Sequence, residues 1–159
     1  MATRDRGTTA TATAATSTPM IGAGRFLLRP YEPSDAQEMA AAVRESVDSV
    51  GRWMTWAKPD FSVSDAACWF DACSQARAAG SAHEFGIYSA DGRYVGGCGL
   101  NQFSTLNRFC NLGYWVRRSR QREGAATAAI FALRRLALDG LGQSRVEIIV
   151  PKAMTPVWR

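Results

Sequence analysis

The segment of residues 115–129 combines residue types that could bind an anion. Four arginines fall within residues 117–122, and a glycine and several small residues follow them in a helix-like run. The first amides of a helix have no internal partner and carry partial positive charge, so a phosphate can bind there. Residues 124–126 are small enough for a bulky anion to approach the backbone, and Thr127 adds a hydroxyl. The turn therefore predicts a phosphate site, and a solvated arginine cluster on the surface is the alternative.

Other chemistries find little support in the sequence. It has neither the Gly-Lys-Ser/Thr run of a P-loop nor the GxGxxG pattern of a dinucleotide-binding fold. Its four cysteines show no CxxC spacing and its single histidine is His83, so we expect no metal site. A cysteine nucleophile would need an activating base, and only His83 could serve.

The hydrophobic pattern predicts elements that place the arginine-rich turn between a strand and a helix. The expected strands span residues 25–32, 84–92, 93–103, 108–117 and 145–150, and the expected helices span residues 33–46, 62–80 and 124–142. A helix between the last two strands makes them parallel neighbours. The fold class is therefore α/β (α+β), with a mixed, mostly antiparallel sheet flanked by helices.

The expected helix of residues 62–80 has a recognisable apolar face and a recognisable end. Ala66, Trp69, Phe70 and Cys73 share one side of it at helical spacing, which predicts that this side is buried. Gly80 fits its C-terminal cap.

The N-terminal segment differs in composition from the rest of the chain. Residues 1–19 are rich in Thr and Ala and contain no leucine, isoleucine, valine or aromatic residue. We therefore expect residues 1–22 to form a disordered tail and residues 23–159 to form one domain. Neither a signal-peptide core nor an apolar run of about 20 residues is present, so the prediction is a cytoplasmic protein with no membrane partner. The net charge of +5 favours an anionic ligand but is too small to indicate nucleic acid.

Several segments together resemble the GNAT superfamily of acetyl-CoA-dependent N-acetyltransferases. The residues QREGAA (121–126) are similar to its Q/R-x-x-G-x-G/A motif, and RFLLRP (25–30) resembles its first strand. The segments NLGYWV (111–116), YVGGCGLNQF (94–103) and ATAA (126–129) resemble its ribosomal-protein branch, the RimJ/RimL-like group. The resemblance covers roughly residues 23–153, in order and with matching spacing.

This resemblance implies an acetyl-CoA site and a direct acetyl transfer to an amine. The pyrophosphate would bind the arginine-rich turn, and the pantetheine arm would pair with the preceding strand. A strand amide exposed there would polarise the thioester carbonyl. The implied cofactor-binding residues are Trp115, Val116, Gln121, Arg122, Glu123, Gly124, Ala125, Ala126 and Thr127. No metal is implied.

Two departures from the family pattern affect the chemistry. Asn111 stands where many relatives have glutamate, and an asparagine can orient a water but cannot act as a base. The proton acceptor is therefore unassigned, and Glu84 is a candidate for which we expect a solvated surface position instead. Met154 and Val157 stand where an asparagine and a serine belong, which indicates a C-terminally truncated member that lacks the final helix and hairpin, or one whose end has diverged.

The acceptor side of the site is predicted from the connection between the first two helices. Trp53 and Trp56 could form the walls of a pocket, and Asn101 could bind an acceptor backbone; packing in the core is the alternative for the tryptophans. The acceptor expected from the family is a protein N-terminus of the ribosomal type, and a small amine stays open. A non-catalytic CoA-binding or interaction protein is the alternative function. We do not expect an RNA-binding role, because the arginines have no aromatic interleaving beyond Trp115.

Overall fold

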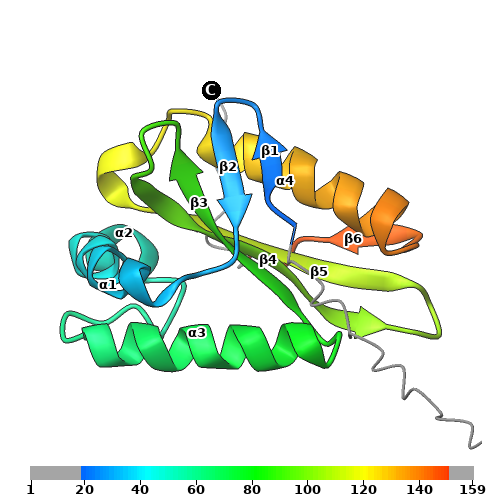
Figure 1. Ribbon diagram of the computed structural model, residues 1–159, viewed down its shortest axis with the longest axis horizontal. Helices are drawn as coiled ribbons and strands as arrows, with labels where there is room; N and C mark the ends of the chain where they lie inside the picture. Colours follow the sequence, from blue (N-terminus) through cyan, green and yellow to red (C-terminus); the bar gives the residue numbers. More distant parts are fainter. Residues whose placement is uncertain (1–18, 151–159) are drawn as a thin grey trace, which may run out of the picture.

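One six-stranded sheet runs through the computed structural model, which describes residues 19–150 (Figure 1). Its strands follow the order of the sequence from β1 to β6. All neighbours are antiparallel except β5 and β6, which are parallel as the sequence predicts. The strands are β1 (Ile21–Ala23), β2 (Phe26–Arg29), β3 (His83–Ser89), β4 (Tyr94–Ser104), β5 (Phe109–Val116) and β6 (Arg145–Glu147).

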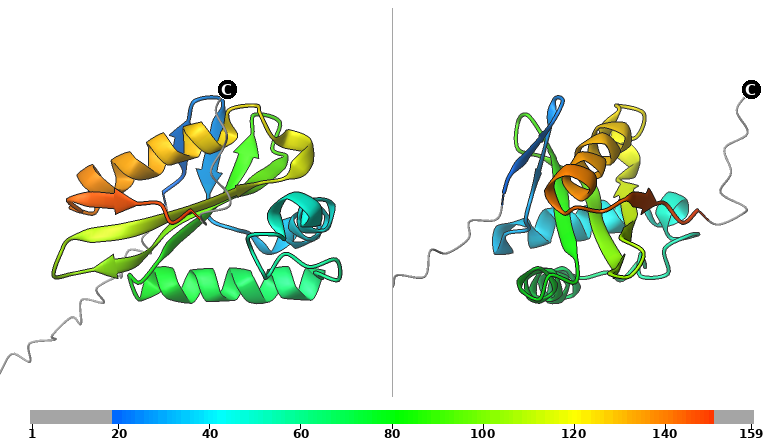
Figure 2. Two further views of the ribbon diagram at one scale, coloured as in Figure 1. Left: turned by 180° about the vertical axis from the view of Figure 1, so that it is seen from behind. Right: turned by 90° about the vertical axis from the view of Figure 1, so that its right-hand side faces the viewer.

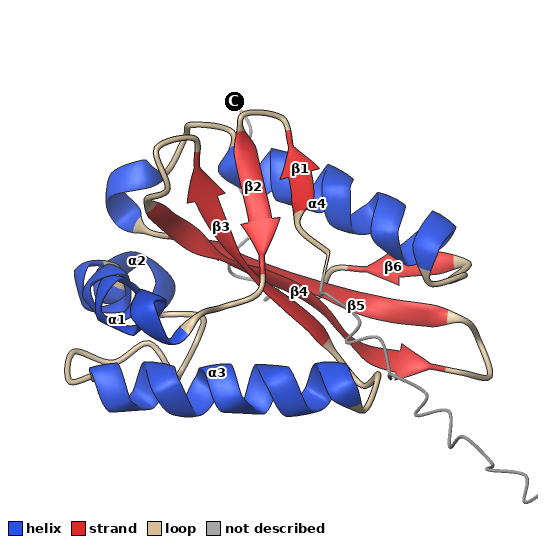
Figure 3. Cartoon of the chain, in the orientation of Figure 1, coloured by secondary structure: helices blue, strands red, loops and turns tan. Residues whose placement is uncertain are grey.

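Helices cover both faces of this sheet, so the predicted mixed fold class is confirmed (Figures 2 and 3). α1 and α3 pack against β4 and β3, while α4 packs against β1, β2, β4 and β5. The helical segments are η1 (Pro33–Asp35), α1 (Ala36–Glu45), α2 (Val47–Val50), α3 (Val63–Ala78), η2 (Arg118–Arg120), α4 (Ala125–Arg135) and the π-helical turn η3 (Leu136–Gly140).

Each face of the sheet has its own apolar core. On the α4 side, Ala125, Ala129 and Leu133 recur every four residues and pack with Leu100 and Leu112. This packing fixes the N-terminus of α4 directly after the arginine-rich turn.

The second core holds α1 and α3 on the opposite face. Met39 and Phe70 belong to it, together with Tyr88 from the sheet. α3 begins at a capping box, in which the Ser62 Oγ accepts from the Asp65 amide at 3.0 Å and an Asp65 carboxylate oxygen accepts from the Ser62 amide at 2.9 Å. The start of α3 is therefore fixed both by its cap and by the core.

The strands at the two edges of the sheet have other bounds than the sequence predicts. β1 begins at Ile21 and pairs with β2, so residues 21–22 belong to the sheet and not to the predicted tail. The strand expected at 145–150 ends at Glu147. Residues 1–18 and 151–159, including Met154 and Val157, lie outside the described residues, so the disordered tail and the missing final helix and hairpin stay predictions.

A part-buried ion pair joins the first connection to the sheet. Both terminal nitrogens of Arg29 donate to the Asp35 carboxylate, at 2.8 and 2.9 Å, and the Arg29 guanidinium lies 3.7 Å from the centre of the Tyr88 ring. The Tyr88 hydroxyl and the Glu32 amide also donate to Asp35, at 2.9 and 2.7 Å. Burial raises the pKa of the Asp35 carboxyl, but these hydrogen bonds outweigh burial and hold its pKa below the ordinary 3.8.

Replacing Asp35 by asparagine is expected to lower the free energy of unfolding by roughly 3 kcal/mol at neutral pH, because Arg29 then keeps a part-buried charge without its main counterion. The wild-type advantage is complete above pH 3.8 and disappears as the pH falls through the lowered pKa of Asp35. Urea unfolding at several pH values measures both effects. Glu32→Gln is the matched control, because Glu32 is exposed and its carboxylate lies as far as 4.0 Å from Arg29, so this ion pair contributes little to stability. An equal loss in both variants would contradict this account.

Candidate active site

The arginine-rich turn, α2 and the loop after α2 enclose a pocket of about 330 Å³, here called the anion pocket. All predicted cofactor-binding residues except Glu123 line it: Trp115, Val116, Gln121, Arg122, Gly124, Ala125, Ala126 and Thr127. Ser49, Val50, Trp53, Met54, Tyr114 and Arg120 complete the wall. The structure thus gathers residues from the end of β5 and the start of α4 around one cavity.

The backbone at Gly124 leaves the start of α4 open to the close approach of a ligand. Gly124 has a left-handed φ of +85°, and no atom lies within 4 Å of the position that a Cβ would take. The first amides of the 11-residue helix α4 follow directly. The site therefore offers backbone donors and open space, which are the two features that a bulky anion needs.

Glu123 forms hydrogen bonds within the protein and does not line the pocket. Its carboxylate accepts from the Arg120 Nε at 2.9 Å, and its carbonyl accepts from the Arg25 guanidinium at 2.6 Å. Gln121 donates to the Val116 carbonyl at 3.2 Å and so closes the loop onto β5. Glu123 thus positions the loop, which explains why it alone among the predicted cofactor-binding residues does not line the pocket.

The four arginines divide into two pairs with different roles. Arg117 binds Glu45 at 2.6 Å and Arg118 lies 3.7 Å from Asp48, so these two join the turn to α1 and α2. Arg120 and Arg122 line the anion pocket. With the Arg120–Glu123 pair, three of the four arginines have carboxylate partners within the fold.

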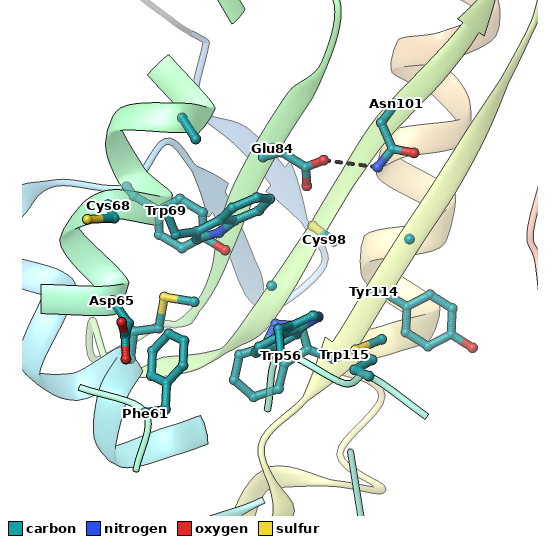
Figure 4. Close-up of a pocket in the computed structure, with 16 residues that line it drawn as sticks. Trp56, Phe61, Asp65, Cys68, Trp69, Glu84, Cys98, Asn101, Tyr114 and Trp115 are labelled. Atoms are coloured by element: carbon teal, nitrogen blue, oxygen red, sulfur yellow. Dashed lines mark hydrogen bonds between the residues drawn. The ribbon is translucent and has the colours of Figure 1, made fainter. Parts of the chain in front are cut away.

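A second cavity of about 520 Å³, here called the acceptor pocket, lies between α3 and the sheet (Figure 4). Aromatic side chains form much of its lining, from Tyr31, Trp56, Phe61, Trp69, Tyr114 and Trp115. Met54, Tyr114 and Trp115 line both cavities. The two pockets therefore meet along the end of β5.

Glu84 is the one carboxylate that the sheet contributes to the acceptor pocket. Asn101 donates to a Glu84 carboxylate oxygen at 3.0 Å (Figure 4). Asn111 donates to the Asn101 side-chain oxygen at 2.9 Å. Glu84 faces Gly99 across the β3–β4 ladder, and a Cβ on Gly99 would overlap the Glu84 carboxylate. The expected solvated surface position of Glu84 is therefore wrong.

Burial raises the pKa of the Glu84 carboxyl above the ordinary 4.5. The hydrogen bond from Asn101 and the positive charge of Arg77 act in the opposite direction but do not offset burial. A carboxylate with a raised pKa is a stronger base, so this group suits the removal of a proton from an ammonium ion.

The predicted acceptor residues separate in the structure. Trp56 and Asn101 line the acceptor pocket, and Trp56 packs against Trp115 with ring centres 5.5 Å apart. Trp53 lines the anion pocket and not the acceptor pocket, so the structure does not bring it together with Trp56 and Asn101. Asn111 lines neither pocket and contacts the site through Asn101. Trp69 belongs to the site as well, because it is 40% exposed and does not join the core with Phe70.

Two of the cysteines, Cys73 and Cys98, are poorly suited to act as nucleophiles because both are buried. Burial raises the pKa of the Cys73 thiol to about 12 and also raises that of Cys98.

Within residues 19–150, no group of three or more His, Cys, Asp or Glu side chains is placed to hold a metal ion. Among the helices of the described part, none is both long and apolar enough to span a membrane.

A family model described as an acetyltransferase (GNAT) domain matches residues 25–153. A Vibrio cholerae structure described as a ribosomal-protein-serine acetyltransferase superposes with a TM-score of 0.77 at 26% identity, over 86% of this chain and 76% of that one. Mycobacterium smegmatis RimJ with a CoA disulfide gives 0.77 at 24%, over 85% and 69%. RimL, a ribosomal L7/L12 α-N-protein acetyltransferase bound to coenzyme A, gives 0.74 at 18%, over 82% and 73%. Among curated proteins, no significant match is found.

Proposed function

Because the chain belongs to the GNAT family of acetyltransferases, we propose that this N-acetyltransferase moves the acetyl group of acetyl-CoA directly to the α-amine of a protein N-terminus. One observation carries the proposal: the anion pocket and the acceptor pocket meet at Met54, Tyr114 and Trp115, and Glu84 stands in the second. A thioester and an amine held in the two pockets can therefore meet without an acyl-enzyme.

The anion pocket suits the diphosphate of acetyl-CoA by charge and by space. These phosphates would meet the amides at the start of α4 and the side chains of Arg120 and Arg122. The open space at Gly124 leaves room for a phosphate against the backbone. Acetyl-CoA supplies an acyl group already activated as a thioester, so the chain's own residues need only orient the two substrates and accept the first proton of the ammonium ion. The amine nitrogen then forms the bond to the acetyl carbon, the carbon–sulfur bond breaks, and the CoA thiolate takes up the second amine proton and leaves as the thiol.

We assign the role of general base to Glu84. An amine reaches the pocket as an ammonium ion, and it becomes a nucleophile when the Glu84 carboxylate accepts one of its protons. Asn101 holds this carboxylate, and Asn111 in turn holds Asn101. These two asparagines are positioning residues, since they fix the carboxylate in the orientation that the proton transfer needs.

Two features support an N-terminal acceptor over a lysine side chain. RimL is by its printed description an α-N-protein acetyltransferase, and it shares this fold. The acceptor pocket also places Asn101, a donor and acceptor of hydrogen bonds, beside Glu84, where the first peptide group of an N-terminal residue would lie.

Mass spectrometry of a mixed pool of peptides after incubation with acetyl-CoA tests this function. Half of the peptides carry a free α-amine and no lysine, and half carry a blocked N-terminus and one lysine. We expect acetyl groups on the free α-amines alone. Acetylation of the lysine peptides instead would overturn the N-terminal assignment, and binding of acetyl-CoA with no product in either half would favour the non-catalytic alternative.

A further inference from the structure

The lining of the acceptor pocket is mostly apolar, and its charged groups are carboxylates. Large apolar side chains surround it, and two of them, Trp56 and Trp69, are each 40% exposed. Figure 4 shows Trp69 reaching from α3 toward the side that holds Glu84, while Trp56 and Phe61 lie at the other end. Tryptophan rings left open to solvent beside a cavity of this size provide a surface that an apolar group can cover.

The charged side chains that line the acceptor pocket are all acidic, and Arg77, whose positive charge acts on Glu84, does not line it. Its lining contains the carboxylates of Glu84 and Asp65 and no lysine, arginine or histidine among the described residues. Asp65 is fixed at the start of α3 by its capping box, so its charge stays near the rim. The pocket thus favours a cation and disfavours an acceptor that carries a carboxylate or phosphate next to its amine.

We propose, on the basis of the function proposed above, that the preferred acceptor is a peptide N-terminus whose first residue has a large aromatic or aliphatic side chain. Its ammonium group binds at Glu84, and its side chain covers the aromatic wall formed by Trp69 and Trp56. An N-terminal serine or alanine satisfies the first contact but leaves the wall exposed to water. A peptide starting with aspartate brings a negative charge toward Glu84 and Asp65.

Equilibrium binding separates this proposal from the question of turnover. Dissociation constants are measured with the full chain saturated with CoA for four peptides that differ only in their first residue, which is Phe, Leu, Ser or Asp. We expect the Phe and Leu peptides to bind about tenfold or more tightly than the Ser peptide, from the apolar area they bury, and the Asp peptide to bind most weakly. An N-acetylated Phe peptide, which has no ammonium group, is expected to bind more weakly than its free form.

Two variants assign the preference to the pocket wall. Trp69→Ala is expected to reduce the difference between the Phe and Ser peptides to less than about threefold, because it removes the exposed ring at Glu84. Phe131→Ala is the matched control, since Phe131 is 66% exposed on α4 and lines neither pocket, and it is expected to keep the full preference.

Three results would overturn the proposal: Ser bound as tightly as Phe, Asp bound more tightly than Ser, or a Phe preference that survives Trp69→Ala. Acetylation of the Ser peptide together with equal affinities would reject this preference and leave the proposed function intact. Tight binding of the Phe peptide with no acetylation of any peptide would support the preference and reject the proposed function.

Discussion

Replacing Glu84 by glutamine is expected to lower kcat by roughly 10²- to 10⁴-fold while the affinity for acetyl-CoA stays unchanged. Glutamine keeps the size of the side chain and can still bond to Asn101, but it cannot accept a proton from the ammonium ion. Glu84 does not line the anion pocket, so binding of acetyl-CoA should not change. Calorimetric titration measures the affinity, and release of the CoA thiol measures turnover.

The control for this variant is Asp71→Asn, which removes an exposed carboxylate from the same side of the molecule without touching either pocket. We expect its kcat to match the wild type. A Glu84→Gln enzyme with wild-type kcat would show that another group accepts the proton.

The pH dependence of turnover follows from the same carboxyl. Because burial raises the pKa of Glu84 above 4.5, the carboxyl is protonated and inactive at low pH, and kcat/KM should rise with pH through this raised pKa. The acid limb should therefore lie above the range of an exposed glutamate, and it should be absent from the residual activity of Glu84→Gln. The same limb in both proteins would assign it to a different group.

Gly124→Glu is the second change with a large expected effect, and it should weaken acetyl-CoA binding by about 100-fold or more. The new side chain brings a negative charge and bulk to the start of α4, where the phosphates of acetyl-CoA are proposed to lie. It also forces a residue with a Cβ into the left-handed backbone at φ +85°.

The backbone strain of this variant needs a control of its own. Gly92→Glu has the same left-handed conformation, with φ +81° and nothing within 4 Å, but it lies in the β3–β4 turn away from both pockets. We expect a similar loss of thermal stability in both variants and a loss of acetyl-CoA affinity only at Gly124. Equal affinity in the two variants would place the phosphates somewhere else.

Local sequence signals were enough to predict most of the fold. Gly80 follows the end of α3 as the sequence predicts, with a left-handed φ of +69°, and the Asp-Gly sequence at residues 91–92, a strong hairpin signal, joins β3 to β4. β1 was missed because three residues with two small side chains carry no periodic pattern, and only pairing with β2 makes them a strand.

The acceptor side of the site depends on contacts that no local pattern contains. Glu84 looks like a polar residue at the start of a strand, but Gly99 on the neighbouring strand gives it a place inside the pocket. The pattern of the sequence put Trp69 on a buried helical face, and its exposure follows only from the space between α3 and the sheet. Trp53 and Trp56 lie in an irregular loop, where spacing does not determine which cavity each ring lines.

The release of CoA thiol by the purified chain, measured with acetyl-CoA and a pool of peptides with free N-termini, tests the proposed acetyl transfer most directly. A transferase of the proposed kind gives saturable turnover, with one thiol released for each peptide acetylated on its α-amine. Saturable binding of acetyl-CoA by calorimetry, with no thiol release above that of the Glu84→Gln variant, would contradict the proposed transfer and identify a protein that binds the thioester without transferring its acetyl group.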